Sequence, residues 1–221
     1  MSDAGTAGAA AGAWFEDAAE VPESAARRHG VRRRLVMRHA ARLFIEKGYA
    51  ATTVDDIGRA AGVTGPAVYR HFPTKRALLA SVVEDGCDQL ARRTGDAGTD
   101  PDLAPGEALA ELVEAYIAFI VGHRHLALLI EDTMPALDTG GRAGVLASSR
   151  RFRGRMLALL REASPDLPEA AARLAVTSVV GMCRNAIRAR TTMSDEALRR
   201  RLAGQAMAVL LLPADERSTL R

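Results

Sequence analysis

The stretch from Thr53 to Leu79, TVDDIGRAAGVTGPAVYRHFPTKRALL, constrains the fold more than any other part of this chain. Gly58 directly follows the apolar Ile57, and Gly62 lies where the chain has to turn. A residue without bulk lets two helices cross closely, and glycine adopts the left-handed conformation of a sharp turn at the least cost in free energy. The stretch is therefore predicted to form a helix, a three-residue turn, a short second helix and the start of a third.

The residue types also locate the ends of these helices. Thr53 offers an N-cap with Asp56 three residues later, a variant of the capping box. Thr64 can cap the second helix, and Pro66 is tolerated in its first turn because no intrahelical donor is lost there. These signals predict a second helix over Gly65–His71, the right size to enter the major groove of DNA.

Positive charge is concentrated around this motif. Residues 27–93 carry fourteen Lys or Arg against six Asp or Glu, whereas residues 94–221 carry sixteen of each. Residues 1–26 carry five acids and no base. Because phosphates would lie against the helix-turn-helix, this distribution favours double-stranded DNA as a partner.

The rest of the sequence predicts an all-α chain, because no segment alternates with period two over the length of a strand. Apolar residues at helical spacing start at Val31 and predict a helix that Gly48 ends, with Tyr49 packing back beneath it. Roughly five more helices are predicted after the turn-rich segment TGDAGTDPDLAPG. The predicted parts are a disordered tail 1–26, a three-helix helix-turn-helix DNA-binding domain 27–93, a linker 94–106, a larger helical domain 107–213 and a tail 214–221.

Composition argues against several classes of protein. Aromatic residues make up only 4% of the chain, which disfavours single-strand binding on a stacking platform. No stretch of about 18 uncharged apolar residues exists, so no membrane partner is predicted. The N-terminus lacks the basic start and apolar core of a signal peptide, and a cytoplasmic location is predicted. Cys87 and Cys183 are interpreted as buried structural thiols rather than a disulfide or redox switch.

Catalysis has little support in the sequence. An enzyme with an appended helix-turn-helix would need a nucleophile with its base, a metal set or a phosphate loop, and no GxSxG, P-loop, GxGxxG or HExxH occurs. His123 and His125 are a weak metal pair because positions i and i+2 point to different faces of a helix. No catalytic residue, metal site or cofactor is predicted.

The residues of the first domain match a known family. ARLFIEKGYAATTVDDIGRAA followed by GVTGPAVYRHFPTKRALL resembles the N-terminal domain of the TetR family of bacterial transcriptional regulators. The resemblance covers about residues 31–90 and departs slightly at Gly58, where alanine is commoner in the family. Residues 94–221 resemble the family only in their length and all-helical layout.

The resemblance implies a homodimer that binds a palindromic operator and is released by a small-molecule effector, apolar or amphipathic, bound in the C-terminal domain. A repressor is the leading interpretation, although activation depends only on where the operator lies. A broad-specificity architectural DNA-binding protein is an alternative, and it predicts little preference for operator over random DNA.

Candidate DNA contacts combine the helix N-termini, the leading edge of the second helix and nearby polar side chains. Thr64 could instead be a pure N-cap, and His71 could cap the helix end. The arginines at the start of the first helix could form an arm that enters the minor groove. The predicted contacts are Thr53, Thr64, Gly65, Pro66, Ala67, Tyr69, Arg70, His71 and Lys75, with Arg32, Arg33 and Arg34 in the possible arm.

The C-terminal domain gives weaker predictions. Residues that could line an effector cavity, or could be plain core, are Tyr116, Phe119, His123, Leu129, Met134, Phe152, Met156 and Cys183. A dimer seam along the last two helices is predicted from Val179, Val180, Ile187, Leu198, Leu202 and Met207. Arginines that could clamp an anionic effector, or could form a solvated face, are Arg150, Arg151, Arg153 and Arg155.

Overall fold

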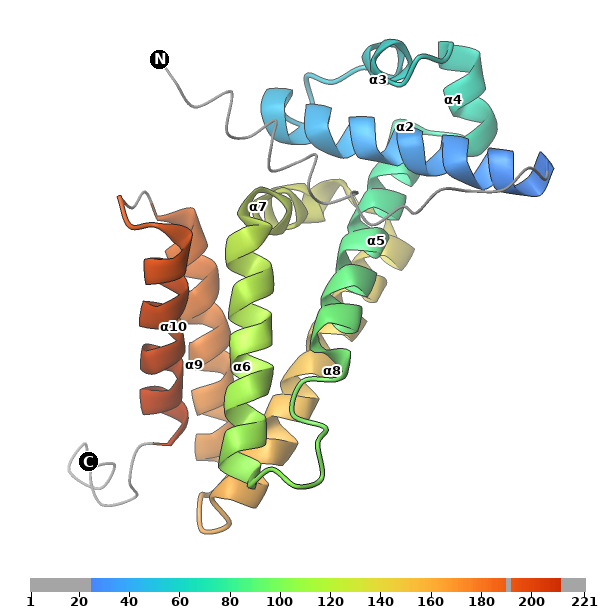
Figure 1. Cartoon of the computed structure of the whole chain (residues 1–221). Helices are drawn as coiled ribbons and strands as arrows, with labels where there is room; N and C mark the ends of the chain where they lie inside the picture. The colour runs from blue at the N-terminus through green and yellow to red at the C-terminus, as the bar shows by residue number, and fades with distance from the viewer. Residues whose placement is uncertain (1–24, 190–191, 212–221) are drawn as a thin grey trace. The chain divides into compact units, whose positions relative to one another are not determined.

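The computed structural model describes residues 25–189 and 192–211 (Figure 1). Every regular element in these residues is a helix, which confirms the predicted all-α class. The predicted tails fall outside the described residues, except that residues 25 and 26 begin the first helix. The elements are α2 (Ala25–Lys47), α3 (Val54–Ala60), α4 (Gly65–His71), α5 (Lys75–Gly95), α6 (Pro105–Gly122), α7 (Arg124–Thr133), the 3-10 helix η1 (Met134–Ala136), α8 (Thr139–Ala163), α9 (Glu169–Arg188) and α10 (Asp195–Leu210).

The described residues form two compact units. The first unit comprises residues up to Gly86 together with 125–145, and the second comprises 87–124 and the described residues from 146 on. Helices α5 and α8 therefore contribute to both units. The predicted linker corresponds to the turns and bends between the end of α5 and the start of α6.

The first unit is organised around the long helix α2. This helix begins at Ala25, six residues before the predicted start at Val31. It ends before Gly48, whose φ of +85° lies in the left-handed region that glycine reaches most easily. Tyr49 then packs edge-on against Phe44 with ring centroids 5.2 Å apart, as predicted from the sequence. The core of this unit continues into the inner faces of α3, α4 and the first half of α5.

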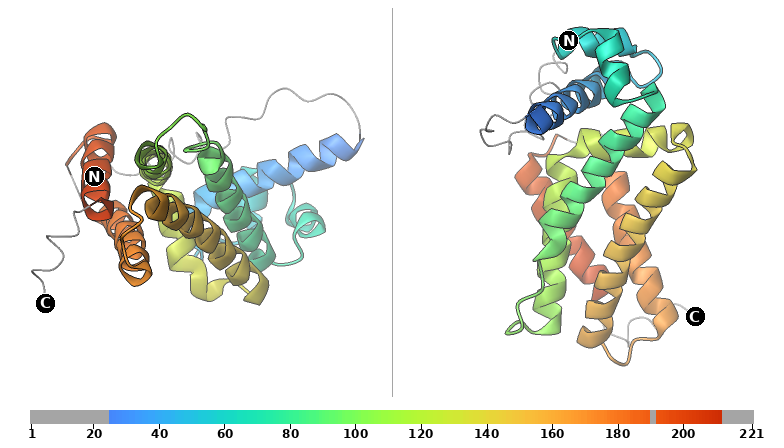
Figure 2. Two further views of the ribbon diagram at one scale, coloured as in Figure 1. Left: turned by 90° about the horizontal axis from the view of Figure 1, so that it is seen from below. Right: turned by 90° about the vertical axis from the view of Figure 1, so that its right-hand side faces the viewer.

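In the second unit, α10 packs against both α6 and α9, and Figure 1 and Figure 2 show the three helices side by side. Helix α6 is the most apolar of them and buries nine residues. At its start, the Glu107 carboxylate accepts a 3.0 Å hydrogen bond from the backbone N–H of Ala104. Ser194 caps α10 by accepting a hydrogen bond from the N–H of Ala197.

No single helix among the described residues is long and apolar enough to cross a membrane. Helix α6 and residues 124–136 meet the length and composition criteria only when taken together as a bent pair.

Candidate DNA-binding interface and effector domain

The start of α3 is fixed by a reciprocal pair of hydrogen bonds. Thr53 Oγ1 accepts from the backbone N–H of Asp56 at 3.1 Å, and Asp56 Oδ2 accepts from the backbone N–H of Thr53 at 3.2 Å. The Thr53 hydroxyl also donates to the same carboxylate at 2.7 Å, and this hydrogen bond is the main reason that the pKa of Asp56 is lowered. The predicted capping box is therefore present, and it uses the Thr53 hydroxyl that the sequence also assigned to DNA.

The crossing of α3 and α4 leaves no room for a side chain at position 58. A Cβ there would lie 2.9 Å from the carbonyl oxygen of Val63 and 3.3 Å from the backbone nitrogen of Gly65. Gly62 takes a φ of +66°, and the N–H of Val63 donates to the carbonyl of Gly58 at 2.9 Å. Both glycines thus have the roles that the sequence predicted for them.

Helix α4 has one buried side and one exposed side. The Val68 side chain is only 1% exposed, whereas Tyr69 beside it is 51% exposed. Thr64 caps the helix through a 3.4 Å hydrogen bond from the N–H of Ala67. Gly65 faces the carboxylate of Asp55, which occupies the space that a Cβ would need. All the predicted DNA contacts on α4 are at least partly open to solvent, and they are Gly65, Pro66, Ala67, Tyr69, Arg70 and His71.

Lys75 has a structural role that the sequence did not reveal. Its Nζ donates to the carbonyl oxygens of Tyr49 at 2.8 Å, Thr52 at 2.9 Å and Ala50 at 3.3 Å. The ammonium also lies 4.5 Å from the centroid of the Tyr49 ring. An ammonium has three protons, so these three carbonyls account for all of its donors. Lys75 therefore ties the loop after α2 to the start of α5.

The three arginines of the possible arm lie inside α2, in the first helix as the sequence predicted, and their contact with the minor groove stays a prediction. Arg33 donates to Ser81 Oγ at 3.0 Å, and its guanidinium lies 4.9 Å from the centroid of the Phe72 ring. It thereby joins α2 to α5 and to the end of α4, whereas Arg32 and Arg34 are exposed.

The residues predicted to line an effector cavity are mostly core. Tyr116 stacks on Phe152 with centroids 4.5 Å apart, and Phe119 stacks on His123 at 4.6 Å. The His123 ring lies at the C-terminal end of α6, where Nδ1 is 2.9 Å from the Phe119 carbonyl. Six of the eight residues belong to the second unit, and Leu129 and Met134 belong to the first. The buried residues of this set are Tyr116, Phe119, Leu129, Phe152, Met156 and Cys183.

Cys183 is the buried thiol that the sequence predicted, whereas Cys87 is only partly buried. It is fully buried and forms no disulfide, and burial raises its pKa to about 11. A thiol with so high a pKa carries almost no thiolate near neutral pH.

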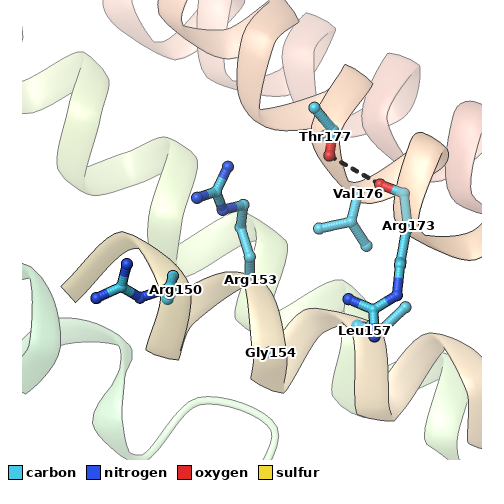
Figure 3. A pocket seen from close by; sticks show the side chains of 7 residues that line it. All are labelled: Arg150, Arg153, Gly154, Leu157, Arg173, Val176 and Thr177. Carbon is cyan, nitrogen blue, oxygen red and sulfur yellow. Dashed lines mark hydrogen bonds between the residues drawn. The ribbon is translucent and has the colours of Figure 1, made fainter. Parts of the chain in front are cut away.

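Two open grooves lie in the second unit, and neither is lined by a residue of the predicted cavity set. One groove, of about 410 Å³, runs between α8 and α9 (Figure 3). Another, of about 500 Å³, runs along α6 and α10 and is lined in part by Ile117, Gly204 and Met207. Residues lining the α8–α9 groove are Arg150, Arg153, Gly154, Leu157, Arg173, Val176 and Thr177.

The predicted dimer seam faces the inside of the subunit. Five of its six residues are at most 8% exposed in the single chain, and only Met207 is partly open. A side chain that is already buried has no surface left for a second subunit. The outer faces of α9 and α10 instead carry residues such as Leu174, which is 67% exposed.

Two family models match the chain in tandem. The model of bacterial regulatory proteins of the TetR family matches residues 36–82, and the model of the tetracycline repressor-like C-terminal domain matches residues 105–211. The first range contains the helix-turn-helix, and the second contains α6 to α10. Together the two models cover most of the described chain.

A known protein is similar to part of the chain. The chain is 34% identical over 96 residues to the Tn10 TetC protein of Escherichia coli, a match that spans 43% of this chain and 47% of TetC. The chain thus spans about half the length of this relative.

Solved structures show the same fold over most of the chain. The regulator PfmR from Thermus thermophilus superposes with a TM-score of 0.69 at 24% identity, covering 80% of this chain and 97% of PfmR. AibR in complex with isovaleryl coenzyme A and operator DNA superposes with a TM-score of 0.68 at 21% identity, covering 79% and 97%. With both family models matched in order and the fold shared over four-fifths of its length, this chain belongs to the TetR family of transcriptional regulators.

Proposed function

We propose that the protein is a homodimeric transcriptional repressor that binds a palindromic DNA operator through α4 and leaves it when a small molecule binds the second unit. It acts in the cytoplasm and catalyses no reaction. The observation that carries the proposal is the two-sided α4, anchored by Val68 and presenting Tyr69 and Arg70 to solvent. The surplus of basic residues in 27–93 supplies a favourable field for phosphates.

The DNA contacts divide into two groups. Gly65, Pro66 and Ala67 lie at the leading edge of α4, where small side chains permit close approach to base edges and thymine methyl groups. Tyr69, Arg70 and His71 follow as longer polar groups for backbone or base contact. The capping threonines Thr53 and Thr64 lie at helix N-termini, where backbone N–H groups favour a phosphate. Lys75 acts indirectly, by holding the loop after α2.

Dimerisation places two copies of α4 on one operator. Two recognition helices related by a two-fold axis must lie roughly 34–36 Å apart to read successive major grooves. The seam that suits this role is the outer face of α9 and α10, in place of the buried residues that the sequence suggested. Small residues on this face permit close helix contact. Its members include Leu174, Ser178, Gly181, Gly204 and Ala208.

The effector acts by binding one shape of the dimer better than the other. The ratio between the effector's affinities for the free and the DNA-bound conformations of the dimer determines how much the effector lowers the operator affinity. AibR has been solved with both an acyl-coenzyme A and operator DNA, which makes an amphipathic effector reasonable for a chain of the same fold.

The test begins with capture of genomic fragments on the full-length protein at physiological salt. A few promoters that share an inverted repeat support the proposal, and diffuse recovery favours the architectural alternative. Binding to the recovered operator is then compared for Arg70→Ala and Arg59→Ala, because both side chains are exposed but Arg59 is already paired with Asp56 at 3.5 Å. Loss of the α4 contact should weaken binding about tenfold or more, since one good contact is worth about 1–3 kcal/mol. Arg59→Ala should change it much less, and equal effects of the two variants would contradict the assignment of α4.

A further inference from the structure

Three arginines from two consecutive helices line the groove between α8 and α9. Arg150 and Arg153 come from α8, and Arg173 comes from α9. Figure 3 shows Arg153 extending from α8 into the space between the helices, and Arg173 extending from α9 towards Leu157. Among the described residues that line this groove, none is acidic. The groove thus concentrates positive charge in a domain whose Lys and Arg equal its Asp and Glu in number.

The structure separates these arginines from others that the same helix carries. Arg155 donates to the carbonyl oxygens of Thr94 at 2.6 Å and Ala97 at 2.9 Å, so its guanidinium holds the last turn of α5 and the turn that follows it. Arg151 is exposed and does not line the groove. Spacing on α8 explains the difference, because positions i and i+3 share a face whereas i+1 lies about 100° away. Helical spacing in the sequence is enough to put Arg150 and Arg153 on one face, but it gives no reason to add Arg173.

The groove also has an apolar floor. Leu157 of α8 and the buried Val176 of α9 lie among its lining residues. Gly154 widens it, since a Cβ at that position would meet nothing within 4 Å. Arginine forms bidentate hydrogen bonds with phosphate and carboxylate groups, so a groove lined by three arginines and by two apolar side chains suits an anion joined to an apolar part.

Arg173 is already held in place by an acid outside the groove. Its Nε and Nη2 donate to Glu169 Oε1 at 2.9 and 2.6 Å, and this hydrogen bonding is the main reason that the pKa of Glu169 is lowered. The remaining N–H groups of Arg173 stay available, because a guanidinium has five donors. Glu169 thus orients Arg173 without lining the groove itself.

We infer that this groove binds the anionic head of the effector, a molecule that carries a pyrophosphate or similar multiply charged group next to an apolar chain. The inference rests on the proposed function, because it names the chemical class of the small molecule that releases the operator. Two sources share this chemistry, a soluble nucleotide thioester such as an acyl-coenzyme A and the head group of an anionic phospholipid. We assign the soluble compound, because a groove of about 410 Å³ is the size of a small-molecule site.

The test measures direct binding by calorimetry to the full-length protein at physiological salt. The probes are octanoyl-coenzyme A, inorganic pyrophosphate and vesicles of phosphatidylglycerol. We expect octanoyl-coenzyme A to bind, pyrophosphate to compete with it at higher concentration, and the vesicles to show no binding. In R150Q/R153Q the Kd for octanoyl-coenzyme A should rise at least about tenfold, since hydrogen bonds to charged groups are worth about 1.5–3 kcal/mol each. Binding only to vesicles would overturn the assignment to a soluble compound.

The single variants R150Q and R153Q are also measured, and Arg151→Gln is their matched control, because it likewise removes one positive charge from the same helix but outside the groove. An equal rise in Kd for R151Q would show a general field effect and overturn the site. Absence of binding by every probe would overturn it as well. Operator binding is measured separately, without any effector, on R150Q/R153Q and on the unmodified protein. The inference is supported if R150Q/R153Q binds the operator normally but no longer binds octanoyl-coenzyme A. If the unmodified protein does not bind its operator, the proposed function is refuted. The calorimetric measurements then still decide whether the groove binds the anion.

Discussion

The helix-turn-helix and the last two helices use glycine for opposite purposes. At the α3–α4 crossing, a Cβ on Gly58 would lie 2.9 Å from the backbone oxygen of Val63, so the glycine is required by contacts within the chain. A Cβ on Gly181 of α9 or Gly204 of α10 would meet nothing within 4 Å. Glycine in an exposed helix interior is destabilising relative to alanine by about 0.5–1 kcal/mol. Gly58 thus allows α3 and α4 of the same chain to meet, whereas Gly181 and Gly204 leave space on the surface that a second subunit can fill.

The sharpest way to break the internal crossing is Gly58→Val. Its branched side chain would press on the backbone of Val63 and Gly65, which cannot move without opening the turn. We expect loss of specific operator binding and a stability loss of about 1–3 kcal/mol, as is usual for overpacked sites. Operator titration and urea unfolding measure the two effects. Gly30→Ala is the control, since a Cβ at Gly30 meets nothing within 4 Å. A variant at position 58 that binds the operator normally would show that the crossing tolerates bulk.

The external role of the small residues is tested by Gly204→Leu. The single chain has room for the new side chain, and leucine is a better helix former, so the fold should survive or gain stability. A second subunit packed on this face would be pushed away, and the dimer should dissociate at concentrations where the unmodified protein stays associated. Sedimentation velocity measures this. Gly144→Leu on α8 makes the same change at another open position and should leave the oligomeric state unaltered. Equal behaviour of the two variants would place the dimer seam elsewhere.

Much of the first unit could be predicted because its signals are local. The capping threonines, the left-handed Gly62 and the bounds of α4 each depend on residues within a few positions of one another, and the structure has them as predicted. The role of Lys75 could not be predicted in this way, because its carbonyl partners lie 23 to 26 residues earlier. The second unit shows the same limit. Apolar periodicity locates its helices but cannot say which face meets the subunit's own core, so it places buried residues such as Val179 in the dimer seam.

Lys75→Met separates a structural lysine from a phosphate contact. The variant leaves three carbonyl oxygens of the loop after α2 without their donor, and we expect a stability loss of about 2 kcal/mol by analogy with hydrogen bonds to charged groups. Urea unfolding measures the loss, and Arg76→Met, at an exposed neighbouring position, should have little effect. If Lys75 instead binds a phosphate, the free energy of unfolding would be unchanged in the variant. The slope of the logarithm of the operator affinity against the logarithm of the salt concentration would then fall by about one.

The smallest expected effect at neutral pH concerns Cys183 in the core of the second unit. Burial raises the pKa of this thiol from 9.0 to about 11, so the folded state holds the proton more tightly than the unfolded state does. The contribution of the protonated Cys183 thiol to the free energy of unfolding is therefore fully present below pH 9 and is lost as the pH rises to about 11. Urea unfolding at several pH values in this window should show a steeper decline for the unmodified protein than for Cys183→Ala, in which the thiol is absent. At about pH 8 the thiolate fraction should also be about a hundredfold lower than for an ordinary thiol, so iodoacetamide should label the partly exposed Cys87 first. The prediction would be contradicted if the free energy of unfolding fell equally with pH in the two proteins and Cys183 were labelled as fast as Cys87. That result would show that the inner face of α9 is open to solvent in the folded protein.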